Sequence, residues 1–289
     1  MTALKNKIDF VVLVSVKMAN GNGDPLDGNR PRTDYDGYGE ISDVCIKRKI
    51  RNRMQDMGYP VFVQSADRSD DGFTDLASRA KTQLDGAKSD SEKAAMACEK
   101  WLDVRTFGQV FAYKGEKKGV SIGIRGPVSI HQAVSVSPVE IESLQITKSV
   151  NGEAPKKGDE SSQGASMSSD RMGMKHFVRF GLYKIKGSIN VQLAEKTGFS
   201  YDDAKVIKEC LRTLFINDAS SARPDGSMQV VKVFWWEHNC KEGQYSAAKV
   251  HDSVHVSLKE GVESANKVED YDITVEPLAG LATDVTEGF

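Results

Sequence analysis

The chain has 289 residues and a formal net charge of −2, and hydrophobic residues make up 39% of it, which is enough to bury a core. No apolar run reaches the ~18 residues that a membrane-spanning helix needs. The four cysteines form no C-x-x-C pair, so neither a zinc site nor a disulfide framework is indicated. We expect a cytoplasmic protein that has no cofactor and contacts no membrane.

The small net charge conceals two halves of opposite sign. Residues 251–289 hold nine acidic and two basic residues, whereas the first 250 residues carry an excess of five basic ones. Local clusters of charge therefore say more about binding partners than the total does.

The first predicted elements are a strand, a long loop and a basic helix. Residues 8–18 are rich in Val and Ile and predict a central strand, and the Gly-, Asn- and Asp-rich stretch 19–40 predicts a loop. Ser42 is a suitable N-cap for the helix that follows. Its apolar stripe is Ile46, Ile50, Met54 and Met57, which recur at helical spacing.

Two insertions are predicted in the middle of the chain. Residues 60–102 have helical patterns separated by polar stretches, so we expect a largely helical insertion. Residues 119–137 alternate as a strand that Gly126-Pro127 interrupts. Residues 149–175 are too polar to bury a core and predict a long flexible excursion.

The last part of the chain predicts a strand at 176–193, an amphipathic helix behind the capping box that Ser200 and Asp203 form, and a strand at 227–239. Without its insertions, the order is strand, helix, strand, strand, helix, strand. This is the split βαβ or ferredoxin-like α+β arrangement, which RNA recognition domains share.

The basic helix has two interpretations. Five cations lie within seven positions, and three of them fall on the side opposite the apolar stripe. They form either a solvated helix face or a surface that neutralises nucleic-acid phosphates without reading sequence. The candidate residues on the helix are Lys47, Arg48, Lys49 and Arg51. The loop before it adds Asn29, Arg30 and Arg32, among glycines that let a ligand approach the backbone.

Further candidates lie outside this region. Arg105 stands near an aromatic residue, and Arg125 lies on a strand face among small residues. The excursion interleaves cations with methionines, which are adaptable apolar side chains. It is either an arm that closes over a nucleic acid or a loop without such a role. Its candidates are Arg171, Lys175 and His176, with Met167 and Met172 as wedges.

Motifs for catalysis and metal binding are missing from the sequence. It has no G-x-S-x-G and no P-loop, and His251 and His255 lack the glutamate of H-E-x-x-H. The aspartates of residues 24–36 fit no register of a calcium loop. We therefore expect no enzyme activity and no bound metal.

The segment "NGNGDPLDGNRPRTDYDGYGEISDVCIKRKIRN" (20–52) resembles the N-terminal signature of the CRISPR-associated backbone subunit of type I Cascade complexes, in its Csd/Csh branch. "DVRTFG" (103–108) and "IRGPVS" (124–129) are similar to the middle motifs of that family, and type I-C is the best fit. The resemblance covers most of residues 8–258.

The resemblance implies a right-hand shape with an RRM-like palm, helical fingers, a web and a flexible thumb loop. We expect the following parts: 1–59 palm with the first strand, loop and basic helix; 60–110 fingers; 111–136 web and palm strands; 137–175 thumb; 176–289 palm with the acidic C-terminal part. In this family, copies stack head to tail along one CRISPR RNA (crRNA), and the thumb displaces a base at intervals.

The resemblance therefore implies a backbone subunit that binds crRNA without sequence preference and presents the spacer to a target DNA strand, in antiviral defence. Its expected partners are crRNA, target DNA, further copies of itself, and the guide-end cap, large and small subunits of Cascade. Two alternatives stay open: a metal-dependent RNA-cutting subunit of type III kind, and a monomeric RNA-binding module.

Overall fold

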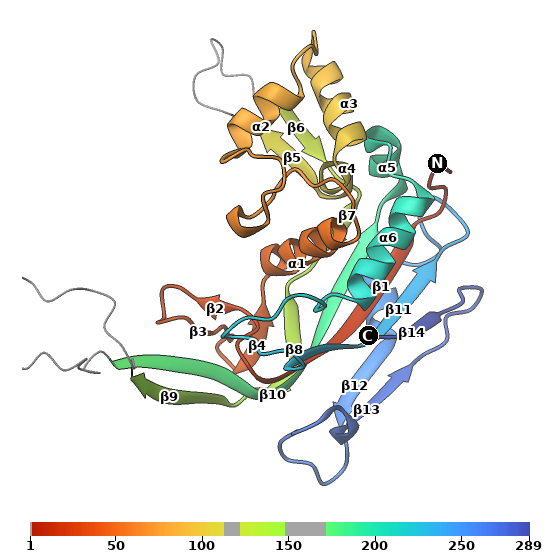
Figure 1. Cartoon of the computed structure of the whole chain (residues 1–289). Helices are drawn as coiled ribbons and strands as arrows, with labels where there is room; N and C mark the ends of the chain where they lie inside the picture. The colour runs from red at the N-terminus through yellow and green to blue at the C-terminus, as the bar shows by residue number, and fades with distance from the viewer. Residues whose placement is uncertain (1, 113–121, 148–171) are drawn as a thin grey trace, which may run out of the picture.

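The computed structural model describes residues 2–112, 122–147 and 172–289, and its centre is an antiparallel sheet (Figure 1). Within these ranges, eight strands join in the order β14–β11–β1–β10–β8–β4, with β7 and β9 also paired to β10. The strands are β1 (Ile8–Ala19), β4 (Tyr38–Ile41), β7 (Val128–Ile130), β8 (Ala133–Pro138), β9 (Ile141–Thr147), β10 (Met172–Ile189), β11 (Met228–Glu237) and β14 (Asp284–Glu287).

Strand β1 is buried on both faces of this sheet, which explains its nearly continuous apolar run. Its even-numbered side chains, such as Phe10 and Val12, pack with α1 (Asp43–Asp56) and α6 (Tyr201–Arg212). Val11 and Leu13 face the opposite core. There the cover is α7 (Ala247–Asp252), β12 (Val254–Leu258), β13 (Tyr271–Val275) and a short 3-10 turn, η3 (Val268–Asp270).

The predicted basic helix is confirmed as α1. The Ser42 hydroxyl accepts a hydrogen bond from the Cys45 N–H at 3.2 Å, which caps the helix, and Ile46, Ile50 and Met54 are at most 1% exposed. The apolar stripe therefore faces the sheet, as its spacing predicts.

The second helix is also confirmed, with its capping box at Ser200 and Asp203. The strand predicted over 176–193 is too long at its C-terminal end. Asn190 leaves the sheet and caps a short helix, α5 (Val191–Thr197), by accepting from the Leu193 N–H at 2.8 Å. An N-cap asparagine inside an apolar run is easily overlooked when strand periodicity is counted.

The insertion after α1 is mostly helical, as predicted, and has a small core of its own around Phe62, Trp101 and Phe111. It also contains a hairpin, of which the strand β6 was predicted and its partner β5 was not. Its elements are η1 (Ala66–Arg68), α2 (Leu76–Gln83), α3 (Asp90–Lys100), α4 (Leu102–Phe107), β5 (Gly108–Phe111) and β6 (Ile122–Arg125).

Two glycines join the insertion to the sheet. Gly108 ends α4 with a φ of 81°, and a Cβ on it would meet the Ile124 carbonyl oxygen. A Cβ on Gly126 would meet the backbone of Thr106 to Gly108. The two backbones therefore touch where β6 ends and β7 begins.

Three further expectations need correction. The loop 19–40 contains a small hairpin, β2 (Gly23–Asp24) with β3 (Arg30–Pro31). Residues 172–175, predicted to be flexible, pair with β9 as part of β10, so that an arm of two strands leaves the sheet. The segment "HDSVHVSL" (251–258) predicts a strand, and Val254–Leu258 does form β12, but its first two residues end the helix α7, which Ser246 caps. Among the described residues, no helix has the length and apolar character needed to cross a membrane.

Candidate nucleic-acid interface

The basic residues of α1 lie between two neighbouring parts of the chain. The insertion packs along one flank of the helix, and the loop between α6 and β11 packs along the other (Figure 1). Four of the five cations bond to these neighbours or to α6, which corrects the expectation of an open positive outer face.

Lys49 is the most deeply placed of these cations. It is 4% exposed, forms an ion pair with Asp218 and lies 5.5 Å from the ring centre of Phe215. Burial lowers the pKa of Lys49, and the Asp218 carboxylate acts in the opposite direction. A side chain with so little exposed surface does not contact a phosphate, so we remove Lys49 from the set of direct contacts.

Arg51 joins the helix to the insertion. Its Nε donates to Oδ2 of the fully buried Asp103 at 2.9 Å, and its guanidinium lies 5.1 Å from the ring centre of Phe107. Asp103 also accepts from the N–H groups of Phe62 (2.7 Å) and Val63 (3.1 Å). Arg51 therefore supplies the counter-charge of the buried Asp103 carboxylate. We also remove Arg51 from the set of direct phosphate contacts.

Arg48 and Arg105 have similar internal partners. Arg48 donates to the Val63 carbonyl at 2.8 Å. Arg105 on α4 makes a two-pronged ion pair with Asp203, at 2.8 and 3.1 Å, and this is the same carboxylate that caps α6. Arg105 was expected near RNA bases, but it holds the insertion against α6 instead.

Four partly exposed cations lie on the hairpin, on α1 and on the loop after α6, and we call this set the basic strip: Arg30, Arg32, Lys47 and Arg223. Among the residues that the structure describes, Lys47 bonds to Asp43 alone, 2.8 Å away on its own helix. On the hairpin, Arg32 lies 3.4 Å from Asp24, and Arg30 lies 3.8 Å from Asp27. All of these pairs are partly open to solvent, where an ion pair is weak and a phosphate can replace the acid.

One residue, Asn20, fixes the backbone around the strip through its side chain and its own N–H. Asn20 donates from its Nδ2 to the Asn29 carbonyl at 2.7 Å, and its N–H donates to the Ala222 carbonyl at 2.9 Å. Asn29 has a φ of 61° and is exposed. The hairpin and the loop after α6 are therefore joined at the end of β1.

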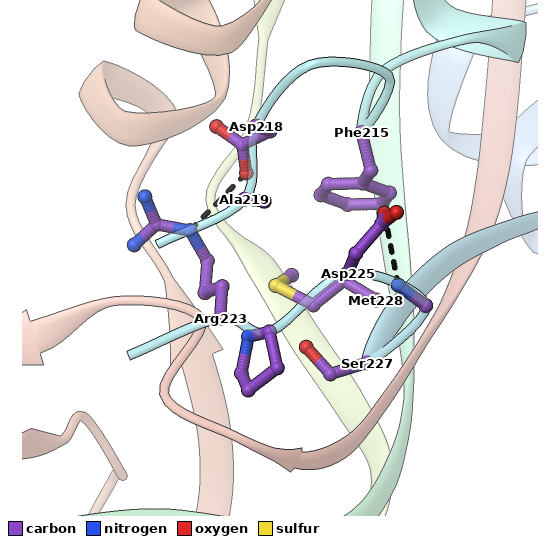
Figure 2. Close-up of a pocket in the computed structure, with 9 residues that line it drawn as sticks. Phe215, Asp218, Ala219, Arg223, Asp225, Ser227 and Met228 are labelled. Atoms are coloured by element: carbon purple, nitrogen blue, oxygen red, sulfur yellow. Dashed lines mark hydrogen bonds and ion pairs between the residues drawn. The ribbon is translucent and has the colours of Figure 1, made fainter. Parts of the chain in front are cut away.

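Arg223 is the member of the strip that sequence reasoning missed. Figure 2 shows it on the loop between α6 and β11, beside a small pocket of about 10 Å³. In the sequence, Arg223 lies inside "SSARPDGS", and the Pro, Asp, Gly and Ser residues of this segment indicate no more than a turn.

Other candidates lie on either side of the strip. Arg125 is exposed on β6 of the insertion, and Lys175 is half-buried on the arm. His176 Nδ1 lies 2.8 Å from the Ser143 hydroxyl, and Met172 is 69% exposed. Arg171 and Met167 lie outside the described residues. In Figure 1, the insertion is above α1 and the hairpin, and the arm of β9 and β10 is below them.

Aspartates of the loop 19–40 accept hydrogen bonds from backbone N–H groups of the same loop. Asp24 accepts from the Leu26 N–H at 3.0 Å, and Asp34 accepts from the N–H groups of Asp36 and Tyr38. In the described part of the chain, no three histidine, cysteine or acidic side chains gather as metal ligands do.

A serine, an aspartate and a histidine meet beneath the sheet, but not as a catalytic triad. Asp9 accepts from the Ser188 hydroxyl and lies 2.8 Å from His238 Nε2, while His238 Nδ1 accepts from the Gln244 N–H. The serine bonds to the carboxylate instead of the imidazole, so the histidine is not placed to take its proton.

A sheet that carries α1 and α6 on one face, with partly exposed cations on and beside α1, fits a nucleic-acid-binding protein. The sequence profile of the family described as CRISPR-associated protein Cas7 matches residues 6–276, and the chain belongs to this family.

A curated relative and two solved structures are also similar to this chain. The CRISPR-associated protein Cas7 of Haloferax volcanii is 27% identical over 234 residues, which cover 74% of this chain and 65% of that protein. A chain of a "CRISPR RNA-guided surveillance complex, pre-nicking" is similar over 89% of this chain and 84% of its own, with a TM-score of 0.50 and 17% identity. A chain of a "CRISPR RNA-guided surveillance complex" has a TM-score of 0.47 and 17% identity, over 89% and 78%. At these identities the likeness concerns the fold.

Arg51 and Lys47 separate internal from surface roles. Arg51→Gln leaves the buried Asp103 charge without its partner, so we expect a loss of about 3 kcal/mol in the free energy of unfolding. Lys47→Gln removes a partly exposed pair within one helix and should cost no more than about 0.5 kcal/mol. Urea unfolding of both variants measures this difference. Equal losses would contradict the roles that we assign to the two side chains.

Proposed function

We propose that this protein is the repeated backbone subunit of a type I-C Cascade surveillance complex, which polymerises along crRNA and presents its spacer to target DNA. The observation that carries the proposal is the basic strip of Arg30, Arg32, Lys47 and Arg223, which lies between the insertion and the arm. Membership of the Cas7 family supports the class of ligand.

The strand order supports a ferredoxin-like palm. Counted along the chain, the core strands are β1, then β7 with β8, then β10, then β11. In the sheet they lie side by side in the order fourth, first, third, second. This is the order of a split βαβ unit. The helices α1 and α6 lie on the same face of this sheet. In this proposal, residues 60–110 are the fingers, 111–136 are the web and palm strands, and 137–175 are the thumb, whose described part includes β9 and the first residues of β10.

The binding is proposed to be independent of sequence. A backbone subunit serves any spacer, so its contacts should reach phosphate and sugar and leave the bases free to pair. Lysine and arginine at partly exposed positions of the hairpin and the helix suit phosphates. Asn29, Arg125, Lys175 and His176 are proposed as additional contacts on either side of the strip.

The assembly is proposed to be head to tail. Contacts between two different surfaces of identical chains do not close, so copies extend along the RNA, and the cap, large and small subunits attach to this filament. Exposed acids on the β12–β13 side, such as Glu260 and Asp272, offer a charge opposite to that of the strip. We propose no cleavage by this chain. RNA that stays intact with the assembled protein and magnesium is the expected result.

Size measured by light scattering tests the proposed assembly. With single-stranded RNA of increasing length, we expect the mass of the complex to rise in steps of one chain, because each copy occupies a fixed length of backbone. RNA of unrelated sequence should give the same steps. A single copy on every RNA would instead indicate a monomeric RNA-binding module.

The salt dependence of RNA binding tests the strip itself. If four phosphates are neutralised per copy, the slope of log affinity against log salt should be about −3 for single strands. Lys47→Gln should flatten this slope by about 0.7 on every sequence. Asp43→Asn should tighten binding, since the acid that competes for Lys47 loses its charge.

Lys205→Gln is the matched control for Lys47→Gln. Lys205 is also a helical lysine paired with an aspartate, Asp202 at 3.4 Å, but it lies on α6 away from the strip. Its variant should keep the slope of the unmodified protein. If Lys205→Gln and Lys47→Gln change binding equally, the charge of the whole protein and not the strip governs affinity.

A further inference from the structure

We propose that Arg223 is a phosphate-binding residue, and that the buried Lys49 positions it through Asp218. The inference rests on the proposed binding of RNA, and it adds two roles to it: a contact on the loop after α6, and an indirect function for the most buried cation of α1.

The guanidinium of Arg223 is anchored at one end and open at the other. Its Nε donates to Asp218 Oδ2 at 3.1 Å, and its side chain is 27% exposed. Its two terminal nitrogens have no protein partner within the described ranges. In Figure 2 they point away from the pocket and from Asp225. An arginine held in this way presents a fork that matches two oxygens of a phosphate.

Asp218 is shared between two cations. The same Oδ2 atom that accepts from Arg223 also pairs with Lys49 Nζ, and Asp218 is 13% exposed. One carboxylate thus balances one of two positive charges, and an excess of one remains beside the surface. Because Lys49 is buried, only Arg223 can bring this excess to an external anion.

The loop that carries Arg223 is fixed before any ligand arrives. Ser220 and Arg223 exchange two backbone hydrogen bonds, of 2.8 and 3.1 Å. The Lys17 N–H donates to the Ser227 carbonyl at 2.8 Å, which holds the other end of the loop against β1. A side chain on such a support loses little conformational freedom on binding.

The loop that carries Arg223 is also close to the rest of the basic strip. Asn20 joins Ala222 to Asn29 of the hairpin, and the Cys45 thiol of α1 contacts the Gly21 carbonyl at 3.7 Å. This loop therefore lies next to both the hairpin and the start of the segment after β1, which contacts the first turn of α1. Two acids line the same pocket as Arg223: Asp218, with which both cations pair, and Asp225, whose carboxylate accepts from the Gly226 N–H at 3.1 Å.

The direct test measures binding of the full chain to single-stranded oligouridylate over a series of salt concentrations. Arg223→Gln should lower affinity about tenfold and flatten the salt slope by about 0.7, as expected for one lost phosphate contact. Arg223→Lys keeps the charge but loses the fork, so it should lower affinity while keeping the slope. This second variant carries the test if Arg223→Gln does not fold.

The role of Lys49 is tested by rescue. Lys49→Met leaves Asp218 with Arg223 as its sole counter-charge, so affinity should fall about fivefold although residue 49 is buried. The double variant Lys49→Met/Asp218→Asn removes both charges of the buried pair and should regain affinity to within about twofold of the unmodified protein. A purely structural role for Lys49 predicts instead that Lys49→Met, at a urea concentration and temperature where it is fully folded, binds RNA as tightly as the unmodified protein.

The outcomes separate this inference from the proposed function. If Lys47→Gln weakens binding and Arg223→Gln and Arg223→Lys do not, the strip binds RNA without Arg223, and the inference is wrong. If Lys49→Met binds as tightly as the unmodified protein, its positioning role is wrong. If the unmodified chain binds no oligouridylate at any salt concentration, the proposed function fails and the inference fails with it.

Discussion

Buried ion pairs on the two flanks of α1 hold the candidate interface together. Arg51 completes the carboxylate of Asp103 and so joins the insertion to the helix, and Lys49 pairs with Asp218 and so joins the loop after α6. The apolar stripe between these flanks packs on β1. Three segments far apart in the sequence therefore keep fixed positions around one helix. Removing one partner of such a pair leaves a buried charge uncompensated, which makes the arrangement sensitive to single substitutions.

Because Lys49, Arg51 and Arg48 bond to groups inside the protein, few cations near α1 remain available to bind a ligand. The strip contains four, and each lies near an aspartate, so the surface is nearly balanced when no ligand is present. The hydrogen bond from Lys47 holds the pKa of Asp43 below its ordinary value, so this acid stays charged at neutral pH. Balanced pairs on a fixed support suit a filament that binds one strand through many copies. Each copy needs only modest affinity, and the chain avoids the strong positive charge that would bind any polyanion.

The sequence predicted the helices and strands whose signals are local. The N-cap at Ser42, the capping box at Ser200 and the double-sided apolar run of β1 each depend on neighbouring residues, and each is confirmed. The roles of the cations depend on distant partners. A helical wheel places Arg51 on the outer face, but it cannot show that Asp103, 52 positions later, covers that face. Arg223 was missed for the same reason, since its proposed role depends on Asp218 and Lys49 and not on the residues next to it in the sequence.

The most direct test of the account is hydrogen exchange of the backbone amides with and without single-stranded RNA. The central claim is that one surface, made by the β2–β3 hairpin, the first turns of α1 and the loop 217–224, contacts the RNA backbone. The account predicts slower exchange in these three segments together, with β12 and β13 unchanged. Protection confined to β12 and β13, or to the face of the sheet that they cover, would contradict it.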